Sequence, residues 1–342
     1  MNNIYENINR FISVKESDGR SKLTINEYKI KLNKFADFIR LQFGTIDIMS
    51  ITEDMIRAYK KYIIDIGNNN NTQRQKIVVL QCFFDWVCKE PNFANYQNPM
   101  LRIELPRAKE VKKDFFNSDE AVDFIYLATD IAFSDNLKGL KGRGLASRDF
   151  VRNISFIIVA LTSAIRVSPL TYARLSDYSR ENFSLTCYRS KGNECVKKFL
   201  PKEAVNLINL YIDKYRPQGL PANAPLWVRE YHEPYNPKMQ ETERTKYIDA
   251  NTGIAYTELG RNEMTLIAKN YTRKLVGHEL SMHEFRHSAN TVYNEGGATL
   301  AEMQALDDHK SPMTTTKYIH SLRREEEEKR VADKIWGALL RK

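Results

Sequence analysis

The sequence predicts a mainly α-helical protein of two domains, the second of which also contains a small antiparallel β-sheet. Apolar residues recur at helical spacing along most of the chain, whereas one segment near residues 183–200 alternates between apolar and polar side chains. Between Pro91 and Lys113 the helical pattern is interrupted by three prolines. Because 342 residues also exceed what one hydrophobic core usually serves, we expect the chain to divide there.

The first domain, residues 1–107, is expected to be an all-helical bundle. Its helices are predicted over residues 4–12, 24–43, 52–67 and 72–88. The second of these helices would begin with a capping box from Thr24 to Glu27 and end at Gly44. The run Asn68–Asn71 is typical of a loop.

Basic residues are concentrated where the two domains meet. We interpret residues 108–113 as a linker and residues 114–342 as the second domain. The positive charges around the linker are Arg102, Arg107, Lys109, Lys112 and Lys113. Such a linker is commonly just solvated, but it can also lie along a DNA backbone and neutralise phosphates. The formal charge of +9 suits a partner rich in phosphate, although other basic proteins share this property.

The second domain is expected to begin with helices over residues 119–133 and 147–165. The alternating segments 183–189 and 195–200 then predict a β-hairpin, with Gly192-Asn193 as its turn. The polar stretch from Tyr231 to Arg261 has no function that the sequence indicates.

Composition excludes several classes of protein. The longest apolar stretch is too short to cross a bilayer, and the N-terminus lacks the regions of a signal peptide, so we expect a cytoplasmic protein. The four cysteines, Cys82, Cys88, Cys187 and Cys195, have no CxxC spacing and are expected to be reduced.

The C-terminal segment contains the residues with the clearest chemistry. Ser281 and Glu284 form a capping box that starts a helix reading His283-Glu284-Phe285-Arg286-His287, in which His283 and Arg286 lie on one face. A second capping box, Thr299 to Glu302, begins another helix that ends near Asp308 and His309. A third helix is expected to follow Ser311-Pro312 and to carry Tyr318.

In this order and with these gaps, the chain resembles the tyrosine recombinase, or phage integrase, family over nearly its whole length. The first arginine of the family is matched by Arg166 in Leu161-Thr162-Ser163-Ala164-Ile165-Arg166, and the hairpin lysine by Lys191. The His-x-x-Arg box is matched by His283 and Arg286. The third-box histidine and the nucleophile are matched by His309 and Tyr318.

The resemblance implies DNA cleavage and rejoining through a 3′-phosphotyrosyl intermediate, with neither metal, ATP nor any other cofactor. Two guanidinium groups suit this chemistry because each donates a fork of hydrogen bonds to a phosphate and neither loses its proton. A free phenol has a pKa of about 10, so Tyr318 needs a proton acceptor, for which His283 is the nearest candidate. By resemblance, Lys191 protonates the departing 5′ oxygen and His309 hydrogen-bonds a phosphate oxygen.

The resemblance also implies a fold and an assembly. The first domain would be a SAM-like core-binding domain, and the second a catalytic domain that closes a clamp on double-stranded DNA. The amphipathic tail from Arg323 to Lys342 would dock on a neighbouring protomer in a homotetramer bound to recombination sites, with accessory DNA-bending proteins as possible partners. With no arm-binding domain ahead of the bundle, the chain resembles a simple, Xer-like or transposon-type recombinase.

Two alternatives remain open at this point. The motif from His283 to His287 also fits His-Glu-x-x-His, the signature of zinc-dependent peptidases, with Glu302 as a further candidate ligand. A non-catalytic DNA-binding protein is the other alternative. Its support is Pro169, because the family usually places an acidic residue three positions after the first arginine.

Overall fold

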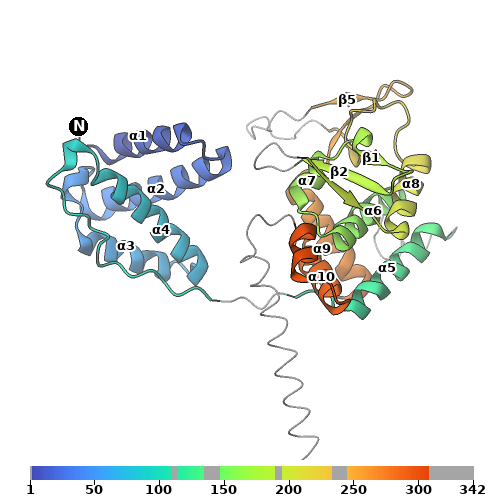
Figure 1. Cartoon of the computed structure of the whole chain (residues 1–342). Helices are drawn as coiled ribbons and strands as arrows, with labels where there is room; N and C mark the ends of the chain where they lie inside the picture. The colour runs from blue at the N-terminus through green and yellow to red at the C-terminus, as the bar shows by residue number, and fades with distance from the viewer. Residues whose placement is uncertain (1, 110–113, 135–146, 189–194, 233–244, 308–342) are drawn as a thin grey trace, which may run out of the picture. The chain divides into compact units, whose positions relative to one another are not determined.

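The computed structural model describes residues 2–109, 114–134, 147–188, 195–232 and 245–307. The chain divides into two compact units, Met1–Lys112 and Lys113–Lys342 (Figure 1). Several predicted features lie outside the described residues: Lys191, the Gly192-Asn193 turn, His309, Tyr318 and the tail from Arg323 to Lys342.

The first unit is a bundle of four α-helices. They are α1 (Ile4–Ser17), α2 (Lys22–Phe43), α3 (Glu53–Asp65) and α4 (Asn70–Val87), with short 3₁₀ helices η1 (Ile48–Ser50) and η2 (Pro91–Phe93). Its core is rich in aromatic rings that meet edge to face, such as Phe11 with Phe83 at 5.5 Å and Phe35 with Tyr59 at 5.0 Å between ring centroids. The bounds of α1 to α4 confirm the four helices that the sequence predicts.

Two local predictions in this unit are wrong. Helix α2 begins at Lys22, because the Ser21 side chain accepts a hydrogen bond from the Thr24 backbone N–H and acts as the N-cap in place of Thr24. Residues Asn70 and Asn71 belong to α4 rather than to a loop, since the Asn69 side chain caps that helix through the Thr72 N–H. Gly44 ends α2 as predicted, with a φ of 67° that suits glycine.

The second unit is built around α6 (Ser147–Ser163). Every residue of this helix from Phe150 to Leu161 is buried. The surrounding helices are α5 (Ser118–Phe133), α7 (Val167–Tyr172), α8 (Lys202–Lys214), α9 (Arg261–Val276), α10 (Met282–Glu295) and α11 (Leu300–Asp307). Figure 1 shows α10 in red beside α6 in green, so the helix with the His-x-x-Arg box lies against the centre of the core.

The described part of this unit contains two small antiparallel sheets, where the sequence predicted one. The first has the order β1-β2-β3, formed by β1 (Tyr178–Ser179), β2 (Ser184–Tyr188), β3 (Cys195–Phe199) and preceded by the 3₁₀ helix η4 (Leu175–Asp177). In it Ser184 pairs with Phe199 and Tyr188 with Cys195, so the predicted antiparallel hairpin forms, but in another register: a two-residue Gly192-Asn193 turn would pair Tyr188 with Lys197. The second sheet, β4 (Val228–Glu230), β6 (Ala255–Glu258) and β5 (Tyr247–Ile248), was missed.

Two class-level expectations concern membranes and cysteines. Within the residues that the structure describes, no helix combines the length and apolar composition that a membrane span requires. All four cysteines are free thiols, and Cys187 is the buried one.

Candidate active site

The N-terminus of α10 is fixed by the predicted capping box. The Ser281 Oγ accepts a hydrogen bond from the Glu284 N–H, and the Ser281 N–H donates to Glu284 Oε2 at 2.5 Å. This reciprocal pair satisfies N–H groups that a helix start would otherwise leave unpaired. His283 and Arg286 therefore lie in the first turns of a helix whose start is fixed by its own side chains.

Arg286 is a buried cation, with only 4% of the residue exposed. Its Nη1 donates to the Ala164 carbonyl at 2.5 Å, and its Nη2 donates to the Asp307 carbonyl at 2.6 Å. The same Nη2 lies 2.9 Å from Asp307 Oδ1 in an ion pair. A guanidinium stays charged at any pH that a protein tolerates, so a buried one needs partners that replace water. These three oxygens are such partners.

Arg166 follows closely in the sequence on Ala164, whose carbonyl contacts Arg286. It is exposed and forms the N-cap of α7, two residues after the Ala164 carbonyl that Arg286 contacts. Ala164 has a φ of 52°, a left-handed conformation that costs energy for a residue with a Cβ. The strained turn between α6 and α7 is also held by the Tyr293 hydroxyl, which donates to the Thr162 carbonyl at 2.5 Å. The fold thus brings the backbone before Arg166 onto α10.

His283 and His287 form a pair on α10. Their Nε2 atoms are 3.2 Å apart, so one imidazole donates to the other, and the rings meet edge to face at 4.6 Å. The His283 side chain is exposed, which leaves it accessible from solvent. This arrangement joins the predicted proton acceptor to a second histidine.

The peptidase alternative fits this geometry poorly. Glu284, which would activate water in a peptidase, uses Oε2 to cap α10. Glu302, the further candidate ligand, is engaged with Thr299, whose N–H and hydroxyl both donate to Glu302 Oε2 at 2.7 Å. Among the described residues there is no group of three histidine, cysteine or acidic side chains that could hold a metal ion. Both glutamates therefore have capping roles.

Pro169 occupies the first turn of α7, three positions after Arg166. Proline is well tolerated in a first helical turn, because the N–H groups there have no partner within the helix. The departure from the family pattern is therefore compatible with the local fold, although it leaves this position without a charge.

The structure adds residues that sequence reasoning missed. Asp307 is fully buried beside Arg286, and the Asn290 Nδ2 donates to Asp307 Oδ2 at 2.8 Å. On the neighbouring strand β3, the Lys198 Nζ donates to the Leu306 carbonyl at 2.5 Å. The sequence offered only proximity as a signal, since Asp307 lies two residues before His309.

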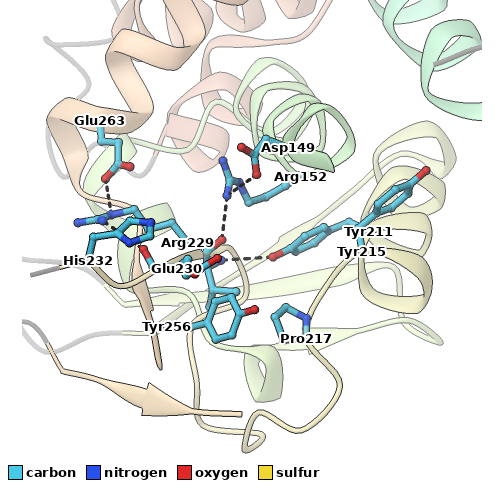
Figure 2. Close-up of a pocket in the computed structure, with 11 residues that line it drawn as sticks. Asp149, Arg152, Tyr211, Tyr215, Pro217, Arg229, Glu230, His232, Tyr256 and Glu263 are labelled. Carbon is cyan, nitrogen blue, oxygen red and sulfur yellow. Dashed lines mark hydrogen bonds and ion pairs between the residues drawn. The ribbon is translucent and has the colours of Figure 1, made fainter. Parts of the chain in front are cut away.

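A cavity in the second unit lies away from this site (Figure 2). It has a volume of about 410 Å³ and is lined by ion pairs of Arg152 with Asp149 at 3.1 Å and Arg229 with Glu263 at 3.2 Å. Its lining includes none of the predicted catalytic residues. Asp149 and Arg152 belong to the first turns of α6, whereas Ala164 follows its last turn. At about 1.5 Å per residue, this helix separates the two regions.

Comparison with known proteins identifies the family. The model of the phage integrase family matches residues 143–325, which is more than half of the chain and spans all six predicted catalytic positions. The chain belongs to the phage integrase family. The match includes α6, α10 and α11, the elements that bring Ala164, Arg286 and Asp307 together.

Individual members of the phage integrase family resemble this chain over nearly its full length. A tyrosine recombinase XerC of Leptospira interrogans is 25% identical over 327 residues, which cover 92% of this chain and 88% of that protein. The structure of a XerH site-specific recombinase in a post-cleavage complex with its difH substrate has a TM-score of 0.65 and 16% identity, covering 94% of this chain and 82% of that one. A lambda integrase tetramer bound to a Holliday junction has a TM-score of 0.59 and 16% identity, covering 91% and 78%.

Proposed function

We propose that this protein is a site-specific DNA recombinase that cleaves and rejoins DNA through a 3′-phosphotyrosyl intermediate. One observation of the structure supports this most strongly. Arg286, a permanently charged group, is held rigidly inside the fold with Nη1 on the Ala164 carbonyl, two residues before Arg166. Two fixed guanidinium groups near one phosphate are what a transition state with growing negative charge on the non-bridging oxygens requires.

In the proposed reaction, Tyr318 attacks the scissile phosphorus and the 5′ oxygen of the next nucleotide departs. His283 accepts the phenolic proton, Lys191 protonates the departing oxygen, and His309 hydrogen-bonds a non-bridging oxygen. Attack of a DNA 5′ hydroxyl on the phosphotyrosyl bond reverses the step, so the energy of the broken diester is conserved. Arg166 and Arg286 stabilise both transition states, and deletion of such a donor typically costs about 3 to 4 kcal/mol.

The proposal extends to domains and assembly. The helical unit, residues 1–107, would bind the core of the recombination site, the linker at residues 108–113 would follow the backbone, and residues 114–342 would carry out catalysis. Solved relatives with the same fold are bound to DNA, one of them as a tetramer on a Holliday junction. A homotetramer joined by the tail from Arg323 to Lys342 is accordingly part of the proposal. Accessory proteins and a cytoplasmic location stay predictions.

Trapping the covalent intermediate tests the function. The substrates are duplexes that cover the genomic DNA on both sides of the gene for this protein. Each duplex carries a nick, at a position that differs from one duplex to the next, and is called a nicked suicide duplex. When cleavage occurs beside a nick, the short product dissociates and the adduct accumulates. We expect a covalent protein–DNA adduct, attached through a 3′ phosphate to Tyr318, that resists denaturation and forms in the presence of a chelator.

Matched variants separate the possible outcomes. Tyr318→Phe is expected to bind the duplex and form no adduct, whereas Tyr126→Phe, which changes an exposed tyrosine of α5, forms it at the wild-type rate. Sequence-selective binding without any adduct from the wild-type chain would favour the non-catalytic DNA-binding protein. Adduct formation that a chelator abolishes would contradict the metal-free mechanism.

A further inference from the structure

Asp307 is an acidic residue in an unusual environment. It ends α11, and none of its surface is exposed to solvent. An isolated buried carboxylate is expensive, because the interior solvates charge poorly, so its contacts must replace water. Those contacts lead to a residue of the proposed active site.

Both carboxylate oxygens and the backbone of Asp307 are held by α10. Oδ1 lies 2.9 Å from Arg286 Nη2, Oδ2 accepts a hydrogen bond from Asn290 Nδ2 at 2.8 Å, and the carbonyl accepts from Arg286 Nη2 at 2.6 Å. Arg286 and Asn290 are four residues apart and therefore lie on the same face of α10. The carboxylate is thus fixed from two sides.

The same contacts restrict Arg286. Asp307 holds Nη2 while the Ala164 carbonyl holds Nη1, so the plane of the guanidinium is set by the turn after α6 and by the end of α11. A guanidinium can donate two parallel hydrogen bonds to a phosphate only when its plane is aligned with the phosphate oxygens. The arrangement therefore preorganises the cation and leaves little reorientation to the reaction itself.

Lys198 adds a second cation to the end of α11. Lys198 donates to the Leu306 carbonyl and Arg286 to the Asp307 carbonyl, so two cations contact the last carbonyls of the helix. Cations at this end are favoured by the helix dipole and by the lack of intrahelical partners for those carbonyls. Two residues further along the sequence is His309.

We propose that Asp307 is a positioning residue for DNA cleavage, which orients Arg286 through a buried ion pair and ties it to the chain segment that leads to His309. The inference rests on the proposed function, since it assigns Asp307 a role in that reaction. Asp307 itself does not contact the DNA. Its effect is transmitted through the guanidinium.

The first test is Asp307→Asn, which keeps the shape of the side chain and removes its charge. With the nicked suicide duplex that the wild-type chain cleaves, the adduct is expected to form on the order of 100-fold more slowly, the scale of a misplaced reacting group. The dissociation constant for the duplex is expected to stay within about threefold, since many other contacts hold the DNA. A cleavage rate within about threefold of wild type, in folded protein, would overturn the proposal.

A double-mutant cycle with Arg286→Lys distinguishes positioning from general stabilisation. If Asp307 acts through the guanidinium, Asp307→Asn slows cleavage by less than about threefold once Arg286 is already lysine, because neighbours in one network are not additive. Fully additive losses would contradict the mechanism. The matched control is Glu302→Gln, an exposed carboxylate on the same helix that caps Thr299, for which an unchanged cleavage rate is expected.

A variant that does not fold and a wild-type chain that forms no adduct are distinguished from a failed positioning role as follows. Should Asp307→Asn fail to fold, Asp307→Glu retains the charge and displaces it by one methylene, and slower cleavage with intact binding is again expected, whereas wild-type cleavage would overturn the proposal. If the wild-type chain forms no adduct, the proposed function fails and this inference fails with it. A wild-type adduct with an unaffected Asp307→Asn variant rejects the positioning role alone.

Discussion

The two units of this protein differ in what they bury. Among its described residues the helical first unit buries two polar side chains, Asn7 and Gln73, and no charged one. The described part of the second unit buries six charged residues: Arg152, Lys198, Arg216, Asp249, Arg286 and Asp307. The first fold thus needs no buried charge among its described residues, whereas the second accepts the desolvation of several charges.

The difference shows where stability and function compete. A buried ion pair contributes little net stability compared with well-packed apolar residues, because desolvation offsets most of the attraction. The Arg286–Asp307 pair contains a proposed catalytic arginine, so in our proposal it meets a requirement for orientation rather than for stability. The first unit, in our proposal, binds DNA through its surface and has no such requirement inside.

The largest effect is expected from Arg286→Ala. The change removes one cation and leaves Asp307 buried without it, which should lower the free energy of unfolding by about 3 to 5 kcal/mol. In folded protein it should also slow adduct formation on the nicked suicide duplex by roughly 10²- to 10³-fold. Denaturant titration and single-turnover cleavage measure the two effects.

The control for that variant is Arg216→Ala. Arg216 is equally buried, with 4% exposed, but donates to the carbonyls of Leu226 and Pro225, outside the proposed site. The Arg216→Ala variant should be less stable than wild type, but its folded form should cleave at the wild-type rate. An equal loss of cleavage in both variants would break the distinction between orientation and stability.

In the first unit, Phe83→Ala should have a similar effect on stability alone. Phe83 is fully buried and contacts Phe11 and Phe84, so its loss leaves a cavity that costs about 3 to 5 kcal/mol. Denaturant titration should show this, and single-turnover cleavage by protein saturated with DNA should stay near wild type. A chemical step slowed as strongly as in Arg286→Ala would mean that the first unit also shapes the active site.

Asn290→Ala is expected to have an intermediate effect. It removes the hydrogen bond to Asp307 Oδ2 and leaves a buried acceptor poorly satisfied, at a cost of about 1 to 3 kcal/mol. Because the Arg286 contact remains, cleavage should slow less than in Asp307→Asn. The ranking of the two variants in one cleavage assay checks this, and a reversed order would shift the positioning role from the carboxylate to the amide.

How far the sequence predicts this structure depends on the range of the interactions. Ser281 with Glu284 and Thr299 with Glu302 are local pairs, and both form as their spacing predicts. The Thr24 capping box was wrong because Ser21, three residues earlier, competes for the same helix start. The sheet β4-β6-β5 was missed since strands of two to four residues show almost no alternation.

The active site was predictable in part for the same reason. Motif order indicated Arg166, Lys191, His283, Arg286, His309 and Tyr318, whose roles are still predictions. Nothing in local spacing links Asp307 to Arg286, because the packing of α11 on α10 brings them together across 21 residues. The buried partner of a buried charge is a tertiary property.

Asp249 gives the second unit a pH-dependent contribution. Burial raises the pKa of this carboxyl, but N–H groups of Asn251, Gly219 and Thr252 donate to it and lower the pKa below its ordinary value of 3.8 overall. Its stabilisation is therefore present above pH 3.8 and lost as the pH falls through the lower folded pKa. Asp249→Asn should reduce the melting temperature at neutral pH, and this difference should shrink in acid.

The exposed Asp123 provides the control for that titration. Asp123→Asn should melt like wild type at every pH, since the side chain lies on the surface of α5. If the melting difference for Asp249→Asn persisted unchanged well below pH 3, the stabilisation would come from the shape of the Asp249 side chain rather than from its charge.

The smallest expected effect concerns the surface of the first unit. If Arg107 contacts a DNA phosphate, Arg107→Gln should lower the slope of log affinity against log salt by about 0.9, with a modest loss of affinity at any one salt concentration. Arg10→Gln is the matched control, because Arg10 is already paired with Glu90 at 2.7 Å and stacked on Trp86. Equal slopes for wild type and Arg107→Gln would mean that Arg107 is merely solvated. A reduced slope with an unchanged cleavage rate on saturated DNA would instead place DNA affinity on the surface of the first unit and chemistry in the buried charges of the second.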